Sequence, residues 1–223
     1  IPPFYFNIIW VQIIEIGFFS LPLVSLTAFF TGAALILQTA VGNYSASSEY
    51  IMPGIVVTSI TRELGPVVVG LVMSGRVGAS ISAEISTMRI NEQIDALKTL
   101  DTNGYKYLVV PRIFAAVITM PILILIADVI GTFGGYVAAI FELHYDSAGY
   151  IANTMKYLTF RDVWLGFIKA AVFGFIVGIT GCYYGYHCTG GAKGVGVSTT
   201  LSVVSSSVLI ITLNYFITFL YIS

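Results

Sequence analysis

The chain has 223 residues, of which 57% are hydrophobic and only 9% are charged, and its net charge is −1. Soluble domains carry about 25% charged residues. A chain of this length cannot bury so much apolar surface in its own core, so its surroundings are expected to be lipid. The net charge gives no indication of nucleic-acid binding, and two cysteines are too few for a disulfide framework.

The first segment, 1–14, contains Pro2, Pro3 and Trp10 and is predicted to be the end of an interfacial helix. It lacks the basic region and the cleavage site of a signal peptide. Because the chain does not begin with Met, we expect that further residues precede it in the native protein.

Five stretches are long and apolar enough to cross a bilayer, which takes about 20 residues of helix. The spans are expected at 16–41, 51–75, 113–141, 163–186 and 194–223. No internal repeat or second domain is visible in the sequence. The predicted fold class is therefore an all-α integral membrane protein, in which residues 1–223 form one transmembrane domain.

The basic residues predict the orientation of the spans. Half of the ten Lys and Arg residues lie in the polar stretch 76–112, between the second and third spans. The positive-inside rule places this stretch and Lys193 in the cytoplasm. The loops 42–50 and 142–162 hold few basic residues, so they and the C-terminus are expected on the outer side.

The second span is interrupted by the run Arg62-Glu63-Leu64-Gly65-Pro66. Pro66 has no N–H, so the carbonyl of Arg62 loses its helical partner, and a kink or break is expected. Arg62 and Glu63 are neighbours in sequence and are expected to point to different sides of the helix rather than neutralise each other. They form either a polar spot in a substrate pathway or a pair that snorkels near the outer surface.

Two further charges lie within predicted spans, Asp128 in the third and Lys169 in the fourth. A charged residue at the centre of a span costs about 2.5–3.5 kcal/mol on insertion scales. Lys169 either snorkels or takes part in a polar pathway. Asp128 either serves helix–helix packing or pairs with Lys169.

A short amphipathic helix is predicted over 90–100, because Ile90, Ile94 and Leu97 recur at helical spacing. Asn91 is predicted to be its N-cap. Helices that lie on membranes are rich in Lys and Arg, whereas this one is net acidic. A face for a cytoplasmic protein partner is therefore favoured over a position on the bilayer surface.

Small residues crowd the segment 74–83, which would let another helix approach closely. Within and just after this segment, Arg76 and Glu84 are each expected to form an ion pair with a neighbouring element.

The sequence contains no clear motif for catalysis or metal binding. The two histidines, His144 and His187, lie far apart on predicted loops, and Cys182 and Cys188 beside His187 are too sparse for a zinc site. The glycine-rich run 190–196 lacks the Gly-Lys-Ser/Thr of a Walker A motif, so the chain is not expected to bind ATP itself. We expect a protein that is not an enzyme and carries no cofactor.

Several ordered motifs recur along nearly the whole chain. They are Arg62-Glu63-Leu64-Gly65-Pro66, Ser74-Gly75-Arg76-Val77-Gly78-Ala79, Ala83-Glu84, Met88-Arg89, Glu92-Gln93-Ile94-Asp95-Ala96-Leu97, Tyr107-Leu108-Val109-Val110-Pro111-Arg112, Asp128-Val129, Gly134-Gly135 and Gly190-Gly191-Ala192-Lys193-Gly194-Val195-Gly196. Together they resemble the MlaE family of ABC transporter permeases, and their common order is more specific than any one of them.

The resemblance implies a homodimer of five-span subunits in the bacterial inner membrane. It implies a pair of cytoplasmic ATPase subunits, which bind ATP and contact the helix at 90–100, a periplasmic MCE-domain protein and a STAS-domain protein on the ATPase. The implied substrate is phospholipid or a related lipid, moved between the inner and outer membranes.

The resemblance also implies roles for individual residues. Glu63 is implied to lie in an outward-facing lipid cavity with Lys169 near it, and Arg62 joins them as a lipid-binding candidate. Leu35 and Leu64 match apolar positions of that cavity. For the helix at 90–100, the residues expected to couple to the ATPase are Glu92, Ile94, Asp95, Leu97 and Lys98.

Two other classes of protein share some of these features. A secondary transporter would also show broken helices and intramembrane charge, but it would be expected to contain an inverted repeat, into which five spans do not divide. A membrane scaffold without an ATPase partner would not account for Arg62 and Glu63.

Overall fold

The computed structural model describes residues 6–42, 48–100 and 103–222, and within these ranges it contains helices and turns but no β-strand. Five helical stretches are long and apolar enough to cross a membrane: Asn7–Val41, Tyr50–Ile90, Tyr105–Phe141, Phe160–Tyr186 and Gly191–Tyr221. The predicted all-α class with five membrane spans is therefore confirmed.

The first stretch begins earlier than the predicted first span. Helix α1 (Phe6–Gly17) contains most of the predicted interfacial segment, and a 3-10 turn at Phe18–Ser20 joins it to α2 (Leu21–Gly42). Residues 1–5 lie outside the described ranges. The helix that was expected at 1–14 thus continues almost directly into the first span.

The second stretch is much longer than predicted, because its helical backbone continues past Gly75 to Ile90. Its 41 residues amount to about 60 Å at 1.5 Å per residue, against about 30 Å for the hydrocarbon core of a bilayer. Part of the polar stretch 76–112 is thus a continuation of this helix and not a loop.

The helices build two compact units, and α4 (Gly65–Met73), α7 (Val110–Phe141) and α9 (Phe160–Tyr186) contribute to both. The first unit comprises Ile1–Ser20, Gly70–Pro121 and Ala170–Ser223. The second comprises Leu21–Val69 and Ile122–Lys169.

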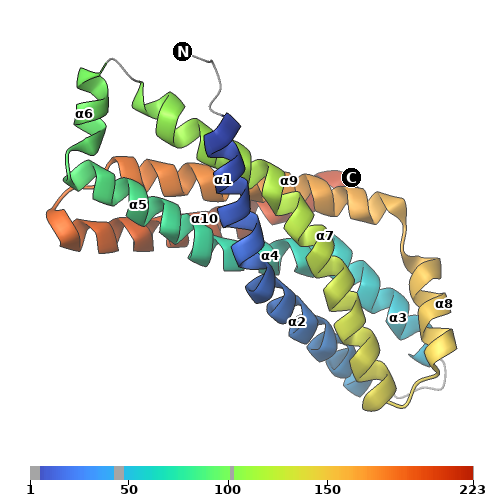
Figure 1. Ribbon diagram of the computed structural model, residues 1–223. Coiled ribbons are helices and arrows are strands. Elements are labelled where there is room, and N and C mark those ends of the chain that lie inside the picture. The colour runs from blue at the N-terminus through green and yellow to red at the C-terminus, as the bar shows by residue number, and fades with distance from the viewer. Residues whose placement is uncertain (1–5, 43–47, 101–102, 223) are drawn as a thin grey trace. The chain divides into compact units, whose positions relative to one another are not determined.

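In the second unit, α3 (Ser48–Ser59) packs along α8 (Ser147–Tyr157), as Figure 1 shows. Tyr150 of α8 is buried there, and burial raises the pKa of its phenol to about 12. The side chain of Asp146 caps α8 by accepting a hydrogen bond from the backbone N–H of Gly149. The buried core between α2, α3, α7 and α8 consists of Ile36, Ala40, Met52, Val56, Ile60, Ala138, Ala139 and Tyr150.

Helices α2 and α7 approach each other most closely at glycines. A Cβ on Gly32 would overlap the backbone carbonyl of Gly131, and a Cβ on Gly134 would overlap the carbonyl of Phe29. Only residues without a side chain let two helix backbones come this near, as in other membrane helix pairs.

In the first unit, α10 (Gly191–Ile222) lies beside α5 (Ala79–Ile90) and the π-helical turn Ser74–Gly78 that precedes it (Figure 1). The hydroxyl of Ser74 bonds to the hydroxyl of Ser206, and Ser202 donates to the carbonyl of Gly78 at 3.3 Å. The close helix approach predicted from the small residues of 74–83 is confirmed, with α10 as the partner.

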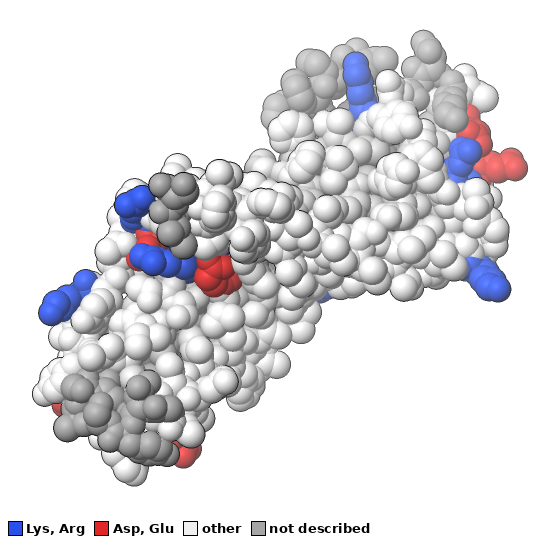
Figure 2. Space-filling view, turned by 180° about the vertical axis from the view of Figure 1, so that it is seen from behind, with Lys and Arg blue, Asp and Glu red and all other residues white. Residues whose placement is uncertain are grey.

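The surface of the molecule suits a lipid environment. Figure 2 shows a face on which most side chains are uncharged and the charged ones gather in a few small groups. Large apolar side chains stand out from α10, among them Phe219 and Leu220, which are 58% and 74% exposed. Such exposed apolar surface is expected where lipid tails replace water.

We predict that Gly32→Ala destabilises the protein, because the new methyl group forces α2 away from the Gly131 carbonyl. The loss should be about 1–3 kcal/mol, measured as a lower melting temperature of the purified protein in detergent. Gly196→Ala is the matched control, because nothing lies within 4 Å of a Cβ there and alanine favours the helix. Equal melting temperatures for Gly32→Ala and wild type would contradict the close packing of α2 and α7.

Candidate functional site

The predicted break in the second span takes the form of a π-helical turn at Ile60–Leu64, between α3 and α4. The backbone N–H of Gly65 donates to the carbonyl of Ile60, five residues earlier. Pro66 follows and has no N–H to donate to the Arg62 carbonyl. Single π-helical turns of this kind often occur at functional sites.

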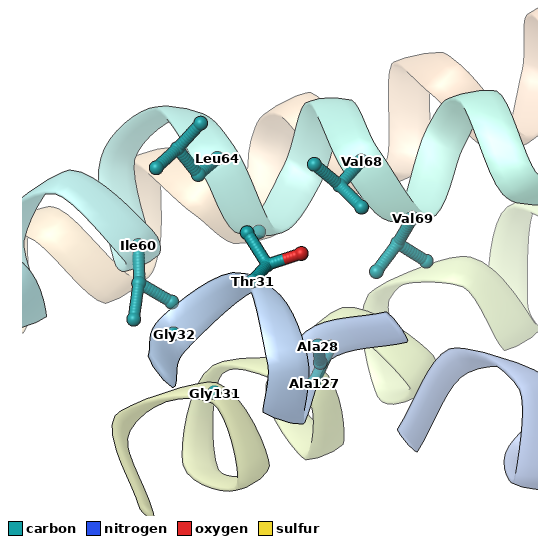
Figure 3. A pocket seen from close by; sticks show the side chains of 10 residues that line it. Ala28, Thr31, Gly32, Ile60, Leu64, Val68, Val69, Ala127 and Gly131 are labelled. Carbon is teal, nitrogen blue, oxygen red and sulfur yellow. The ribbon is translucent and has the colours of Figure 1, made fainter. Parts of the chain in front are cut away.

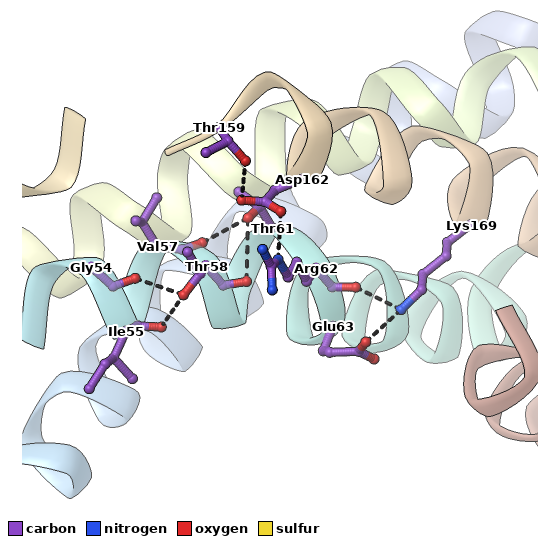
Figure 4. Close-up of polar contacts among 10 residues, drawn as sticks. All are labelled: Gly54, Ile55, Val57, Thr58, Thr61, Arg62, Glu63, Thr159, Asp162 and Lys169. Atoms are coloured by element: carbon purple, nitrogen blue, oxygen red, sulfur yellow. Dashed lines mark hydrogen bonds and ion pairs between the residues drawn. The ribbon is translucent and has the colours of Figure 1, made fainter. Parts of the chain in front are cut away.

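Lys169 of α9 supplies the missing donor, as Figure 4 shows. Its ammonium donates to the backbone carbonyl of Arg62 at 2.7 Å and to Oε1 of Glu63 at 2.8 Å. The Lys169 side chain is fully buried, whereas that of Glu63 is 37% exposed. One buried cation therefore serves both the carbonyl that Pro66 leaves without a helical partner and the adjacent carboxylate.

Arg62 points away from Glu63 and pairs with a different residue of α9 (Figure 4). Its Nε donates to Oδ1 of Asp162 at 2.6 Å, and the hydroxyl of Thr159 donates to Oδ2 of the same carboxylate at 2.6 Å. The prediction that Arg62 and Glu63 point to different sides and do not neutralise each other is confirmed. Each has its own partner of opposite charge.

Asp162 is a member of this cluster that the sequence analysis did not single out. Its side chain is only 1% exposed, although it lies at the start of a membrane span. A signal was present, because Asp162 and Lys169 are seven residues apart and so lie on one face of α9, two turns from each other.

The possible pairing of Asp128 with Lys169 is wrong, because Glu63 and the Arg62 carbonyl occupy the ammonium. Asp128 of α7 instead lies against Gly65, where an added Cβ would overlap its Oδ1. That oxygen is buried and has no hydrogen-bond partner among the described residues. The packing of α7 against the start of α4 is therefore the arrangement that the structure supports.

The two predicted apolar positions lie at different places on the second unit. Leu64 lines a small apolar hollow between α2, α4 and α7, together with Ala28, Thr31 and Val68 (Figure 3). Leu35 is half-buried and packs against the core cluster around Ile36. The structure thus brings Arg62, Glu63 and Lys169 into one polar cluster with Leu64 beside it, and Leu35 is not among the residues of the hollow.

The predicted helix at 90–100 is shorter than expected. Ile90 is the last residue of α5, Asn91 is the C-cap of that helix, and α6 is Gln93–Thr99. Glu92 has a φ of 58°, a left-handed conformation that interrupts the helix between them. The prediction that Asn91 is an N-cap is therefore wrong.

The residues expected to couple to an ATPase differ in exposure. Glu92 and Asp95 are exposed, and Asp95 forms an ion pair of 2.9 Å with Arg89. Ile94 is fully buried and Leu97 is half-buried, so these two residues anchor α6 to the rest of the chain. The side chain of Lys98 lies outside the described part of the structure.

Other charged residues of the first unit have structural partners. Glu84 forms the predicted ion pair, with Arg112 at 2.8 Å. Arg76 donates to the hydroxyl of Ser20, and no carboxylate pairs with it in the described ranges, so its predicted ion pair is replaced by a neutral acceptor.

Five long apolar helical stretches, and a cluster of four charges at a break in one of them, two of which are buried, define a multi-pass membrane protein with an intramembrane polar site. The model of the family described as Permease MlaE matches residues 9–220, so the chain belongs to the MlaE permease family. The chain is accordingly the permease subunit of an ABC transporter and is not itself catalytic.

Three relatives illustrate the range of similarity. A probable ABC transporter permease protein of Rickettsia bellii is 54% identical over 220 residues, which is 99% of this chain and 85% of the relative. A probable ABC transporter permease protein of Synechocystis is 37% identical, over 94% of this chain and 80% of the relative. The intermembrane phospholipid transport system permease protein MlaE of Haemophilus influenzae is 31% identical, over 96% and 82%.

We predict that Glu63→Gln destabilises the protein more than Lys169→Met does. The first change leaves a buried charge, the ammonium, without its carboxylate. The second leaves a neutral group, the Arg62 carbonyl, without a donor, and a carboxylate that is 37% exposed. The loss for Glu63→Gln should be about 1–3 kcal/mol, below the value for a fully buried pair because Glu63 is 37% exposed.

Thermal unfolding in detergent measures both variants, and the double variant Glu63→Gln/Lys169→Met provides the control. Its melting temperature should exceed that of Glu63→Gln alone, because no unpaired buried charge remains. If the losses of stability in the two single variants simply added up in the double variant, the pairing of Glu63 with Lys169 would be contradicted.

Proposed function

We propose that the chain moves phospholipid between the inner and outer membranes of a bacterium, as the homodimeric inner-membrane subunit of an ABC system. The observation that carries the proposal is the Lys169 ammonium, buried in an apolar span and shared by the Arg62 carbonyl and Glu63. The Haemophilus influenzae relative is the permease protein of an intermembrane phospholipid transport system, which supports the same substrate.

The chemistry of the polar cluster fits a lipid with a charged headgroup. The side chains of Arg62 and Glu63 are 48% and 37% exposed, so charges of both signs remain accessible beside the break. Their partners, Asp162 and Lys169, are buried and fix them in place. A zwitterionic headgroup offers complementary charges to both.

A two-fold dimer suits this site, because the five helices of one subunit are few to enclose a whole phospholipid. Symmetric homodimers are also the commonest oligomers, and they place equivalent surfaces around one axis. In the proposed dimer the polar clusters of two subunits face a shared lipid cavity on that axis.

The ATPase pair of the proposed complex docks on the exposed face formed by Glu92 and by Asp95 of α6. ATP binds to those partner subunits, and a periplasmic MCE-domain protein and a STAS-domain protein on the ATPase complete the assembly. Closure of the ATPases pushes on α6, and the long helical stretch Tyr50–Ile90 carries this movement to the π-helical turn at Ile60–Leu64. Membership of an ABC permease family favours this ATP-driven mechanism over a secondary transporter.

The proposal predicts that transport and ATPase binding can be separated. Glu63→Lys places a third cation beside Lys169 and Arg62, so phospholipid transfer by the reconstituted complex should fall by about tenfold or more. The ATPase should still copurify with this variant. Glu92→Lys should do the reverse and weaken retention of the ATPase by a similar factor, because it changes only the exposed face near α6.

Glu142→Lys is the matched control for both changes, because Glu142 is exposed, lies just after α7 and belongs neither to the polar cluster nor to α6. It should leave transfer and ATPase retention at the wild-type level. Normal lipid transfer by Glu63→Lys would remove the proposed role of the polar cluster, and full ATPase retention by Glu92→Lys would remove the proposed docking face.

A further inference from the structure

A second cavity of about 280 Å³ lies in the same unit, between α3, α7, α8 and the start of α9. This volume is at the lower end of the range for small-molecule sites. Much of its wall is apolar, with Leu125 and Val129 from α7 and Met155 and Leu158 from the α8 region. Glu63 and Lys169 are not among its lining residues, so it is separate from the site already described.

The threonines of this cavity can only accept further hydrogen bonds. Thr61 donates its hydroxyl proton to the carbonyl of Val57 at 2.9 Å, and Thr132 donates to the carbonyl of Asp128 at 2.7 Å. Thr154 likewise donates to the carbonyl of Tyr150, at 2.9 Å. Each proton is therefore engaged within its own helix, and the oxygen lone pairs remain for a donor.

The fourth polar group of the cavity is Asp128, a residue that is only 7% exposed. Its Oδ1 is packed against Gly65, which does not line the cavity, and neither oxygen of the carboxyl group forms a hydrogen bond or an ion pair within the described ranges. A buried acceptor that lacks a donor is unfavourable, so a ligand that brings a donor gains a strong interaction here.

We propose that this cavity binds a membrane-soluble amphiphile that has an apolar chain and a hydroxyl or amine donor at its polar end. The donor bonds to Asp128, and the chain packs on Leu125, Met155 and Leu158. An anionic group such as a phosphate is disfavoured, because no Lys or Arg lines the cavity to pair with it. Val129 and Met155 are 70% and 69% exposed, so the cavity opens at the apolar surface of the unit.

Three probes with one chain and different polar ends test the proposal: oleyl alcohol, oleylamine and methyl oleate. Each is added to the permease purified in mild detergent with the subunits that accompany it, and retention is measured by native mass spectrometry. At least one donor probe should be retained about tenfold better than methyl oleate, which carries no donor. Equal retention of all three would overturn the proposal.

Substitutions of Asp128 distinguish the two donor chemistries. Asp128→Leu should abolish the preference for donor probes over methyl oleate. Asp128→Asn keeps an acceptor without the charge, so it should retain the alcohol if a hydroxyl is the natural donor and lose the amine if an ammonium is. A preference that survives Asp128→Leu would overturn the proposal.

A second variant tests the cavity without touching the carboxyl. Met155→Trp enlarges an exposed side chain of the wall and should lower retention of the preferred donor probe by about tenfold. Phe219→Trp is the matched control, because Phe219 of α10 is similarly exposed and does not line the cavity. Equal retention by the two tryptophan variants would place the bound probe elsewhere and contradict the proposal.

Discussion

The hydrogen bond from the Lys169 ammonium to the Arg62 carbonyl is the interaction on which the polar site depends. Pro66 removes the N–H that this carbonyl would accept in a regular helix, and a span in lipid has no water to replace it. A cation from a neighbouring helix satisfies the carbonyl and at the same time neutralises Glu63. The charged run can therefore remain inside an otherwise apolar span, because every charge in it has a partner.

This arrangement requires helices that approach one another closely. In the second unit, Gly32, Gly131 and Gly134 let the backbones of α2 and α7 come together, and Gly166 of α9 lies against the carbonyl of Thr61, just before Arg62. The resulting proximity places Lys169 and Asp162 of one helix within reach of two adjacent residues of another. Small residues thus act on the site indirectly, by setting the distance between the helices that carry its charges.

The sequence predicted what depends on composition and local chemistry. Hydropathy predicted the five spans, and Pro66 predicted the position of the break. Because Arg62 and Glu63 are neighbours in sequence, they were predicted to point to different sides of the helix. Features that depend on other helices were missed. Asp162 lies just before the predicted fourth span, and only the structure shows its pairing with Arg62. The helical stretch also continues past Gly75, where Ser74 contacts Ser206 of α10. Positive φ angles are usually predicted at glycines, so the sequence did not indicate the positive φ of Glu92 that shortens α6.

The most direct test of the account is the charge-swapped double variant Glu63→Lys/Lys169→Glu, with phospholipid transfer and melting temperature as readouts. A simple ion pair would survive the exchange. The account predicts that the swap fails to rescue Glu63→Lys, because a carboxylate at position 169 would face the Arg62 carbonyl, and two acceptors repel each other. Recovery of wild-type transfer and stability in the swapped protein would contradict the account and show that only the pair of charges matters.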